Sequence, residues 1–210
     1  EESVWLGGQV STQAVPPDEH DYIEDYGRTE SYAQYRKHIR DYYRRYYPLS
    51  EKAQNDAFLN PGKGWVSALC HEPRVSARVL EDMLTPYLAN GQLTLWYETE
   101  PISAYRNQKK EVEYVWVYRK DVQEKVRVEA HYFLDATELG DLLPMTDTAY
   151  VTGSESKDDT GELHAIDVAD PLDMQAITWC FAVSLEDEGD YTIEKPALYD
   201  FWKEHRSHFW

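Results

Sequence analysis

The first residues of the chain have types and spacing suited to binding a nucleotide. Glu1 is followed, after five intervening residues, by the pair Gly7-Gly8 and then by Gln9. A carboxylate at this position can accept hydrogen bonds from ribose hydroxyl groups, and successive glycines let the backbone pass close to a bound ligand. A glycine pair by itself is also typical of an ordinary turn. A nucleotide site therefore needs support from a second element.

Such an element lies in residues 132–143, which read YFLDATELGDLL. An apolar segment ends at Asp135, and Ala136 and Thr137 then provide small side chains where a backbone could pass close to a ligand. Open α/β sheets bind ligands at the carboxyl ends of their parallel strands. The presence of both motifs, in this order and with a predicted meander between them, favours one shared site over two unrelated turns.

The elements that must position these motifs follow from the periodicity of the chain. Apolar residues recur every three or four positions over 31–47 and 74–89, which predicts two amphipathic helices. Ser31 would cap the first helix, and Asn90-Gly91 would end the second. The predicted strands cover residues 92–97, 100–106, 111–119 and 124–132 and a returning segment that ends at Asp135. Helices that alternate with strands, with an antiparallel meander inserted between parallel strands, predict the α/β fold class.

Net charge limits the partners of the protein. The chain has 39 acidic and 21 basic residues, giving a net charge of −18, which disfavours nucleic acid and anionic membrane surfaces. Arg36, Arg40 and Arg44 lie four residues apart on the helix 31–47. This spacing predicts a solvated basic face, which could instead dock an acidic surface of the protein itself or an anionic substrate. We expect a small-molecule substrate, no nucleic acid and no membrane partner, and the oligomeric state stays open.

Several weaker patterns predict ordinary structure. Residues 18–20 (DEH) could transfer protons, although a solvated loop is the simpler interpretation. Residues 62–67 (GKGWVS) lack the Gly-Lys-Ser/Thr ending of a phosphate loop, so we expect a turn. Cys70 and Cys180 lack CxxC spacing and are expected to be reduced and buried. The apolar run 174–183 predicts a buried strand or helix. A cytoplasmic location is expected, although a signal peptide removed before Glu1 would leave no trace.

The sequence resembles FAD-dependent oxidoreductases with a glutathione-reductase-like FAD domain. The similarity extends over nearly the whole chain and is carried by the segments LGGQVSTQAVP, LNPGKGWVSALCHEPRV, YFLDATELGDLLP and DPLDMQAITWCFAV. The resemblance implies FAD as cofactor and a Rossmann-like FAD/NAD(P)-binding fold. It also implies the cofactor-binding residues: Glu1 on the ribose, Gly7, Gly8 and Gln9 along the pyrophosphate, and Ala136 and Thr137 beside the cofactor.

Two departures from that family pattern bear on the expected site. The Gly-x-Gly-x-x-Gly loop, which precedes the acid by about twenty residues in such proteins, does not occur in the sequence. Glu138 stands where the related Ala-Thr-Gly motif has glycine. We therefore expect an internal piece of an FAD-dependent oxidoreductase that is inactive by itself. Its residues 1–150 would form a partial FAD domain, and residues 151–210 the start of a substrate-binding region.

The resemblance implies hydride transfer from an unidentified substrate to the flavin, with catalytic residues left unassigned. Two other functions stay open at this point. Seven Trp, 17 Tyr and many carboxylates also suit a carbohydrate-active or carbohydrate-binding domain. A non-catalytic interaction module is the third possibility. None of the seven histidines has the spacing of a metal site, so no metal is expected.

Overall fold

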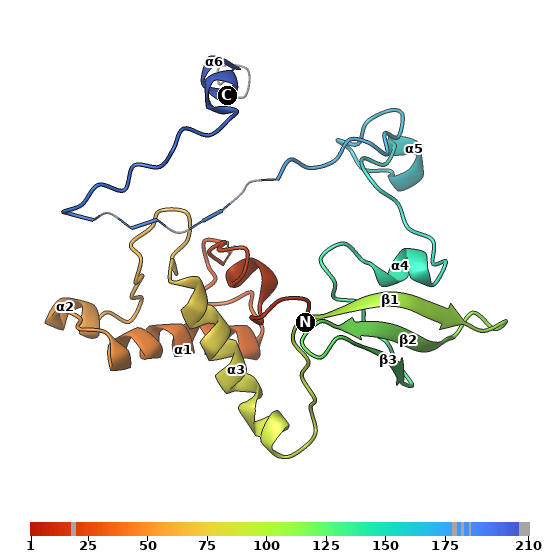
Figure 1. Cartoon of the computed structure of the whole chain (residues 1–210), viewed down its shortest axis with the longest axis horizontal. Coiled ribbons are helices and arrows are strands. Elements are labelled where there is room, and N and C mark those ends of the chain that lie inside the picture. The colour runs from red at the N-terminus through yellow and green to blue at the C-terminus, as the bar shows by residue number, and fades with distance from the viewer. Residues whose placement is uncertain (18–19, 178–179, 182, 185, 206–210) are drawn as a thin grey trace.

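Two helices of 17 residues each, α1 (Glu30–Tyr46) and α3 (Pro73–Ala89), form the centre of the computed structural model (Figure 1). The structure describes residues 1–17, 20–177, 180–181, 183–184 and 186–205. Both helices agree with the sequence periodicity, but the cap of α1 was wrongly predicted. Thr29, in extended conformation, accepts a hydrogen bond from the Tyr32 N–H at 3.2 Å, because it precedes the first turn whereas Ser31 lies within it.

The core lies where α1 crosses α3. Tyrosines and isoleucine on one face of α1 pack against valines of α3, and two leucines from the connecting chain close the gap. The buried cluster consists of Tyr35, Ile39, Tyr43, Leu59, Leu69, Val75 and Val79. A single helical turn, α2 (Glu51–Gln54), lies in the connection. Gly91 ends α3 with φ 77°, a left-handed conformation that favours glycine.

An antiparallel sheet follows the helices, as the sequence predicts for the meander. Its strands are β1 (Thr99–Arg106), β2 (Val112–Arg119) and β3 (Glu124–Glu129), paired in the order β1-β2-β3. Tyr105 and Tyr114 are paired across β1 and β2, and their rings stack at 5.2 Å. The guanidinium of Arg127 in β3 covers the same Tyr114 ring at 4.1 Å. These cross-strand contacts fix the register of the sheet.

The parallel strands that were predicted around the meander are not observed in the part of the chain that the structure describes. Residues 92–97 and 131–135 are irregular rather than hydrogen-bonded strands. A strand needs a neighbouring strand to accept and donate its backbone hydrogen bonds. Within the described part of the chain, residues 92–97 make only scattered backbone bonds, such as Leu93 N–H to the Tyr87 carbonyl at 3.0 Å and the Glu1 amino group to the Trp96 carbonyl at 3.0 Å. The architecture shown is therefore a mixture of helices and one antiparallel sheet.

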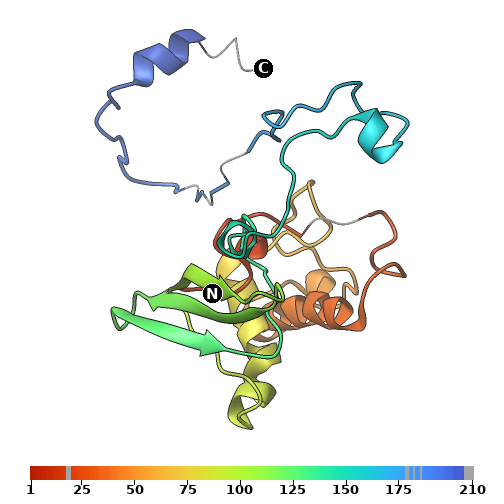
Figure 2. The same ribbon diagram turned by 90° about the vertical axis from the view of Figure 1, so that its right-hand side faces the viewer.

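Three short elements complete the body of the molecule and its continuation. A 3₁₀ turn, η1 (Gly8–Val10), contacts α3, and α4 (Leu142–Met145) packs against β1. Beyond residue 150 the chain leaves this body in both views, with the single turn α5 (Lys157–Thr160) and the helix α6 (Tyr199–His205) (Figures 1 and 2).

The prediction of a buried element at 174–183 was wrong for the residues that the structure describes. Met174, Ile177 and Phe181 are exposed and irregular, and the thiol-bearing residue Cys180 is exposed rather than buried. Residues 178, 179 and 182 lie outside the described part. An apolar segment becomes buried only when another surface covers it, and Met174, Ile177 and Phe181 are 63–81% exposed.

Candidate functional site

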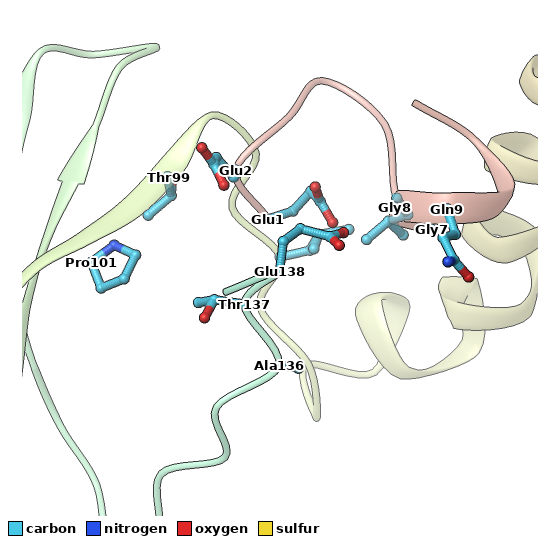
Figure 3. Close-up of a pocket in the computed structure, with 12 residues that line it drawn as sticks. Glu1, Glu2, Gly7, Gly8, Gln9, Thr99, Pro101, Ala136, Thr137 and Glu138 are labelled. Carbon is cyan, nitrogen blue, oxygen red and sulfur yellow. The ribbon is translucent and has the colours of Figure 1, made fainter. Parts of the chain in front are cut away.

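All six residues predicted to bind the cofactor line one cavity. It has a volume of about 640 Å³ and lies between the N-terminal segment, the chain that leads into β1, and residues 136–138 (Figure 3). A cavity of this size is in the range of small-molecule sites. The lining residues are Glu1, Glu2, Leu6, Gly7, Gly8, Gln9, Leu95, Thr99, Pro101, Ala136, Thr137 and Glu138. The tertiary structure thus brings together two motifs that are far apart in the sequence.

Glu1 is held in place by the segment that enters β1. Its amino group donates to the Trp96 carbonyl at 3.0 Å, and its own carbonyl accepts from the Thr99 N–H at 2.9 Å. One carboxylate oxygen, Oε1, accepts from the N–H and the hydroxyl of Ser3 at 3.1 and 2.8 Å. Among the described residues nothing bonds to Oε2, so this oxygen is available to a hydroxyl group of a ligand.

The glycine pair is shaped by a buried serine. Ser11, 1% exposed, donates its hydroxyl to the Leu6 carbonyl at 2.6 Å and its N–H to the Gly8 carbonyl at 3.2 Å. Gly7 has φ 113°, and a Cβ placed on it would lie 2.7 Å from Leu80 Cδ1 of α3. Only glycine therefore lets the backbone turn this close to the helix.

The turn also leaves hydrogen-bond donors at the cavity. Within the described residues, no hydrogen bond engages the N–H groups of Gly8 and Gln9, both of which belong to the cavity lining. Backbone N–H groups need partners, and at a ligand cavity the partner is water or the ligand.

Asp135 positions the second motif. Its Oδ1 accepts from the N–H and hydroxyl of Thr137 at 3.0 and 2.7 Å, and its Oδ2 accepts from the Leu142 N–H at 3.0 Å. The Thr137 hydroxyl in turn accepts from the Asp141 N–H at 2.7 Å. Burial alone would raise the pKa of Asp135, but the hydrogen bonds from Thr137 and Leu142 lower it below its usual value. The charged Asp135 carboxylate accepts three hydrogen bonds and thereby holds the backbone of Ala136–Glu138 in place.

Glu138 changes the character of the site. Figure 3 shows the side chains of Glu1 and Glu138 extending toward Gly8. A Cβ on Gly8 would lie only 2.5 Å from Glu138 Oε1, so this carboxylate occupies the space that the glycine leaves open. The lining contains the carboxylates of Glu1, Glu2 and Glu138 and no Lys or Arg. The cavity is therefore suited to hydroxyl groups and N–H donors at its acidic end, whereas an anionic group depends on the backbone N–H groups.

Two residues that shape the site were not predicted as part of it. Ser11 and Asp135 do not line the cavity but bond to residues that do or that lie beside it. The sequence motifs indicated only the neighbouring small residues. The Asp-x-Thr spacing at 135–137 was the available indication, because Asp side chains commonly accept from the backbone two residues further on. Ser11 gave none, since a buried serine bonded to a carbonyl has no characteristic spacing.

The other candidates lie apart from this cavity. Of residues 18–20, Asp18 and Glu19 are outside the described part, and His20 is exposed. Residues 62–67 form an irregular loop, as predicted, and Cys70 is buried. Over the described ranges no cluster of His, Cys, Asp or Glu could hold a metal ion, and no helix is both long and apolar enough to cross a membrane.

The prediction of a solvated basic face on α1 was wrong for two of its three arginines. Arg36 and Arg40 are only 1% and 5% exposed, and both pair with the carboxylate of Glu24. The alternative, docking onto an acidic group of the protein itself, is the one observed. Burial alone would raise the pKa of Glu24, but the hydrogen bonds and charges of Arg40 and Arg36 lower it to about 2.

A family model described as FAD dependent oxidoreductase matches residues 1–210. No curated protein and no solved structure matches the chain significantly.

Proposed function

Because the chain belongs to the family of FAD-dependent oxidoreductases, we propose that the cavity between its N-terminal segment and Ala136–Glu138 holds part of the FAD. The family establishes FAD as the cofactor and a redox function. The observation that supports this location is the convergence of Glu1, Gly7-Gly8 and Ala136-Thr137 on one cavity.

The residues present fit the sugar and the adjoining backbone contacts of the cofactor. No hydrogen bond within the described residues engages Glu1 Oε2, so this oxygen can accept from a ribose hydroxyl. The N–H groups of Gly8 and Gln9 can donate to a phosphate oxygen. The left-handed turn at Gly7 lets the backbone approach without a side chain. The acidic lining agrees with the same assignment, because ribose is a hydrogen-bond donor.

In this proposal the chain binds and orients FAD, and the redox chemistry belongs to the cofactor. Glu1 fixes the sugar, the Gly7–Gln9 turn directs donors at the diphosphate, and Asp135 holds Ala136 and Thr137 against the ligand. When bound, FAD supplies the redox chemistry, which we propose to be acceptance of a hydride from a small-molecule substrate. Orientation of the reactive ring follows from how rigidly these residues hold the distant end of the molecule.

We also propose that two parts of the chain have different binding roles. Residues 1–150 would contribute to a Rossmann-type FAD-binding region, and residues 151–210 to the binding of substrate. Family membership supports the first part. Exposed apolar side chains, among them Leu163, Ile177 and Phe181 at 76–81% exposure, support the second, because such surface is available to cover a ligand or another part of the protein.

Titration of the protein with FAD, followed by quenching of flavin fluorescence, tests the location of the site. Glu1→Gln keeps the size of the side chain but removes the charge that strengthens a hydrogen bond to ribose. We expect it to weaken FAD binding by about 1–3 kcal/mol. ADP, which has the same ribose and diphosphate, should compete with FAD in the wild type.

Glu162→Gln is the matched control, because Glu162 is exposed and lies outside the cavity lining. It should bind FAD like the wild type. The proposed location is wrong if Glu1→Gln also binds FAD with unchanged affinity, or if ADP does not compete.

A further inference from the structure

A second cavity, of about 400 Å³, lies between residues 24–30, α1 and the Ala57-Phe58 segment. It shares no lining residue with the cavity that contains Glu1. Its lining is cationic although the chain as a whole has a net charge of −18. The basic side chains are Arg28, Arg36, Lys37, Arg40 and Arg44, and the acidic ones are Glu24 and Glu30.

The side chains around this cavity have more positive than negative charge. The guanidinium groups of Arg36 and Arg40 share the single carboxylate of Glu24. Lys37 and Arg44 likewise share Asp41, which lies just outside the lining. Even with Asp41 counted, five cations meet three carboxylates, which leaves a net charge of +2. Two of the cations, Arg36 and Arg40, are buried, and buried charge is costly unless an opposite charge compensates it.

The cluster also has unused hydrogen-bond donors. A guanidinium has five N–H donors. Arg40 uses three of them, on the Leu59 carbonyl at 3.0 Å and on the two oxygens of Glu24. Within the described residues Arg44 makes two such bonds, to Asp41 and to the Asp56 carbonyl, and Arg28 makes one, to the Ile23 carbonyl. Donors therefore remain on three arginines around one cavity.

We propose that this cavity binds a small oxyanion, either a phosphate group or a carboxylate carried by a small molecule. The excess positive charge favours an anion, and arginine N–H groups match the oxygens of both kinds of ligand. Glu24 already shows how a carboxylate is held there, between Arg36 and Arg40. Phe58, 60% exposed, gives the same cavity an apolar wall for the remainder of an organic anion.

The test is heat unfolding and calorimetric titration of the protein, without FAD, against inorganic phosphate and separately against succinate. Sodium chloride keeps the ionic strength constant. We expect a saturable rise of the unfolding midpoint with at least one of the two anions, and the response identifies which oxyanion fits. Arg44→Gln should weaken that binding about ten-fold, as loss of one charge-assisted hydrogen bond predicts.

Two variants keep the result interpretable. Arg28→Gln tests a second, independent wall of the cavity and should also weaken binding, while Arg36, Arg40 and Glu24 stay intact. Arg45→Gln removes the same charge from the same helix, but Arg45 is exposed and does not line the cavity. It should bind like the wild type. No saturable binding of either anion, or equal effects of all three substitutions, would overturn the proposal.

Discussion

Glu138 Oε1 lies against Gly8, at only 2.5 Å from where a Cβ on that glycine would stand. The contact directly joins the two motifs that line the proposed cofactor cavity. It also places a carboxylate beside the N–H groups that we assign to the diphosphate. We therefore expect Glu138 to influence how tightly this cavity holds an anionic ligand.

Replacing Glu138 with alanine should strengthen FAD binding. The substitution removes a negative charge near the diphosphate and opens the space over Gly8, which we expect to contribute about 1 kcal/mol, or roughly a five-fold lower dissociation constant. Flavin fluorescence titration measures it. Glu162→Ala is the control for the change in net charge. Weaker binding by Glu138→Ala would instead mean that this carboxylate accepts a hydrogen bond from the cofactor.

Asp135 should act as a positioning residue for Ala136–Glu138. Asp135→Ala removes all three hydrogen bonds of the carboxylate and should weaken FAD binding by about 1–3 kcal/mol. Asp135→Asn keeps an oxygen for Thr137 but loses the acceptor for Leu142, so its effect should be intermediate. The decisive measurement is the order of FAD affinity, from wild type through Asp135→Asn to Asp135→Ala. Far-ultraviolet circular dichroism of each variant checks that it is folded. Equal FAD affinity in all three proteins would contradict this role.

The pairing of Glu24 with Arg36 and Arg40 should make stability depend on acid pH. The folded pKa of about 2 lies below the ordinary value of 4.5, so the stabilisation is complete above pH 4.5 and is lost as the pH falls toward 2. Because Glu24 is partly exposed and solvent screens its ion pairs, we expect a contribution on the order of 1–3 kcal/mol at neutral pH. Urea unfolding of wild type and Glu24→Gln at several pH values measures it.

The difference in unfolding free energy between these two proteins should shrink as the pH is lowered through this range. Glu162→Gln, which removes one exposed carboxylate, is the control for the change in net charge. A gap between wild type and Glu24→Gln that is constant from pH 7 to pH 3 would show that the ion pairs are not the source of the stability.

A buried hydrogen-bond chain between α1 and α3 should be cooperative. The Leu69 carbonyl can only accept, so it fixes the proton on His71 Nδ1, at 2.7 Å, and leaves Nε2 to accept from the Ser76 hydroxyl at 2.8 Å. Tyr35 must then donate to Ser76. Ser76→Ala leaves both partners unsatisfied and should cost about 1–3 kcal/mol in unfolding free energy. Adding Tyr35→Phe should cost less in that background than in the wild type, which a double-mutant cycle measures.

The same chain makes a further pH effect testable. Burial lowers the pKa of His71 below 6.5, against the opposing hydrogen bond to the Leu69 carbonyl, and the charge of Arg36 lowers it further. The stabilisation is therefore present above pH 6.5 and lost as the pH falls toward the folded pKa. Nuclear magnetic resonance titration of the His71 ring should find the Nδ1–H tautomer and a pKa below 6.5. A ring that titrates above 6.5 would contradict the assignment.

Local pattern was enough to predict the helices and the meander. Apolar spacing placed α1 and α3 within one residue of their observed ends, and the strand-forming residues of 112–119 placed β2. Both kinds of element depend mainly on residues near one another in the chain. The predicted strands at 92–97 and before Asp135 did not form ladders, because a strand also needs a neighbour that its own sequence does not specify.

The sequence by itself determined which residues could bind a nucleotide: Glu1, Gly7-Gly8 with Gln9, and Ala136-Thr137. The conformational freedom of glycine and the small size of glycine, alanine and threonine are properties of the residue types, so they can be recognised from the sequence. Only the tertiary structure decided that these residues share a cavity, that Glu138 covers Gly8, and that Arg36 and Arg40 turn inward onto Glu24. Those outcomes depend on contacts between distant segments, where burial sets the strength of each charge and hydrogen bond.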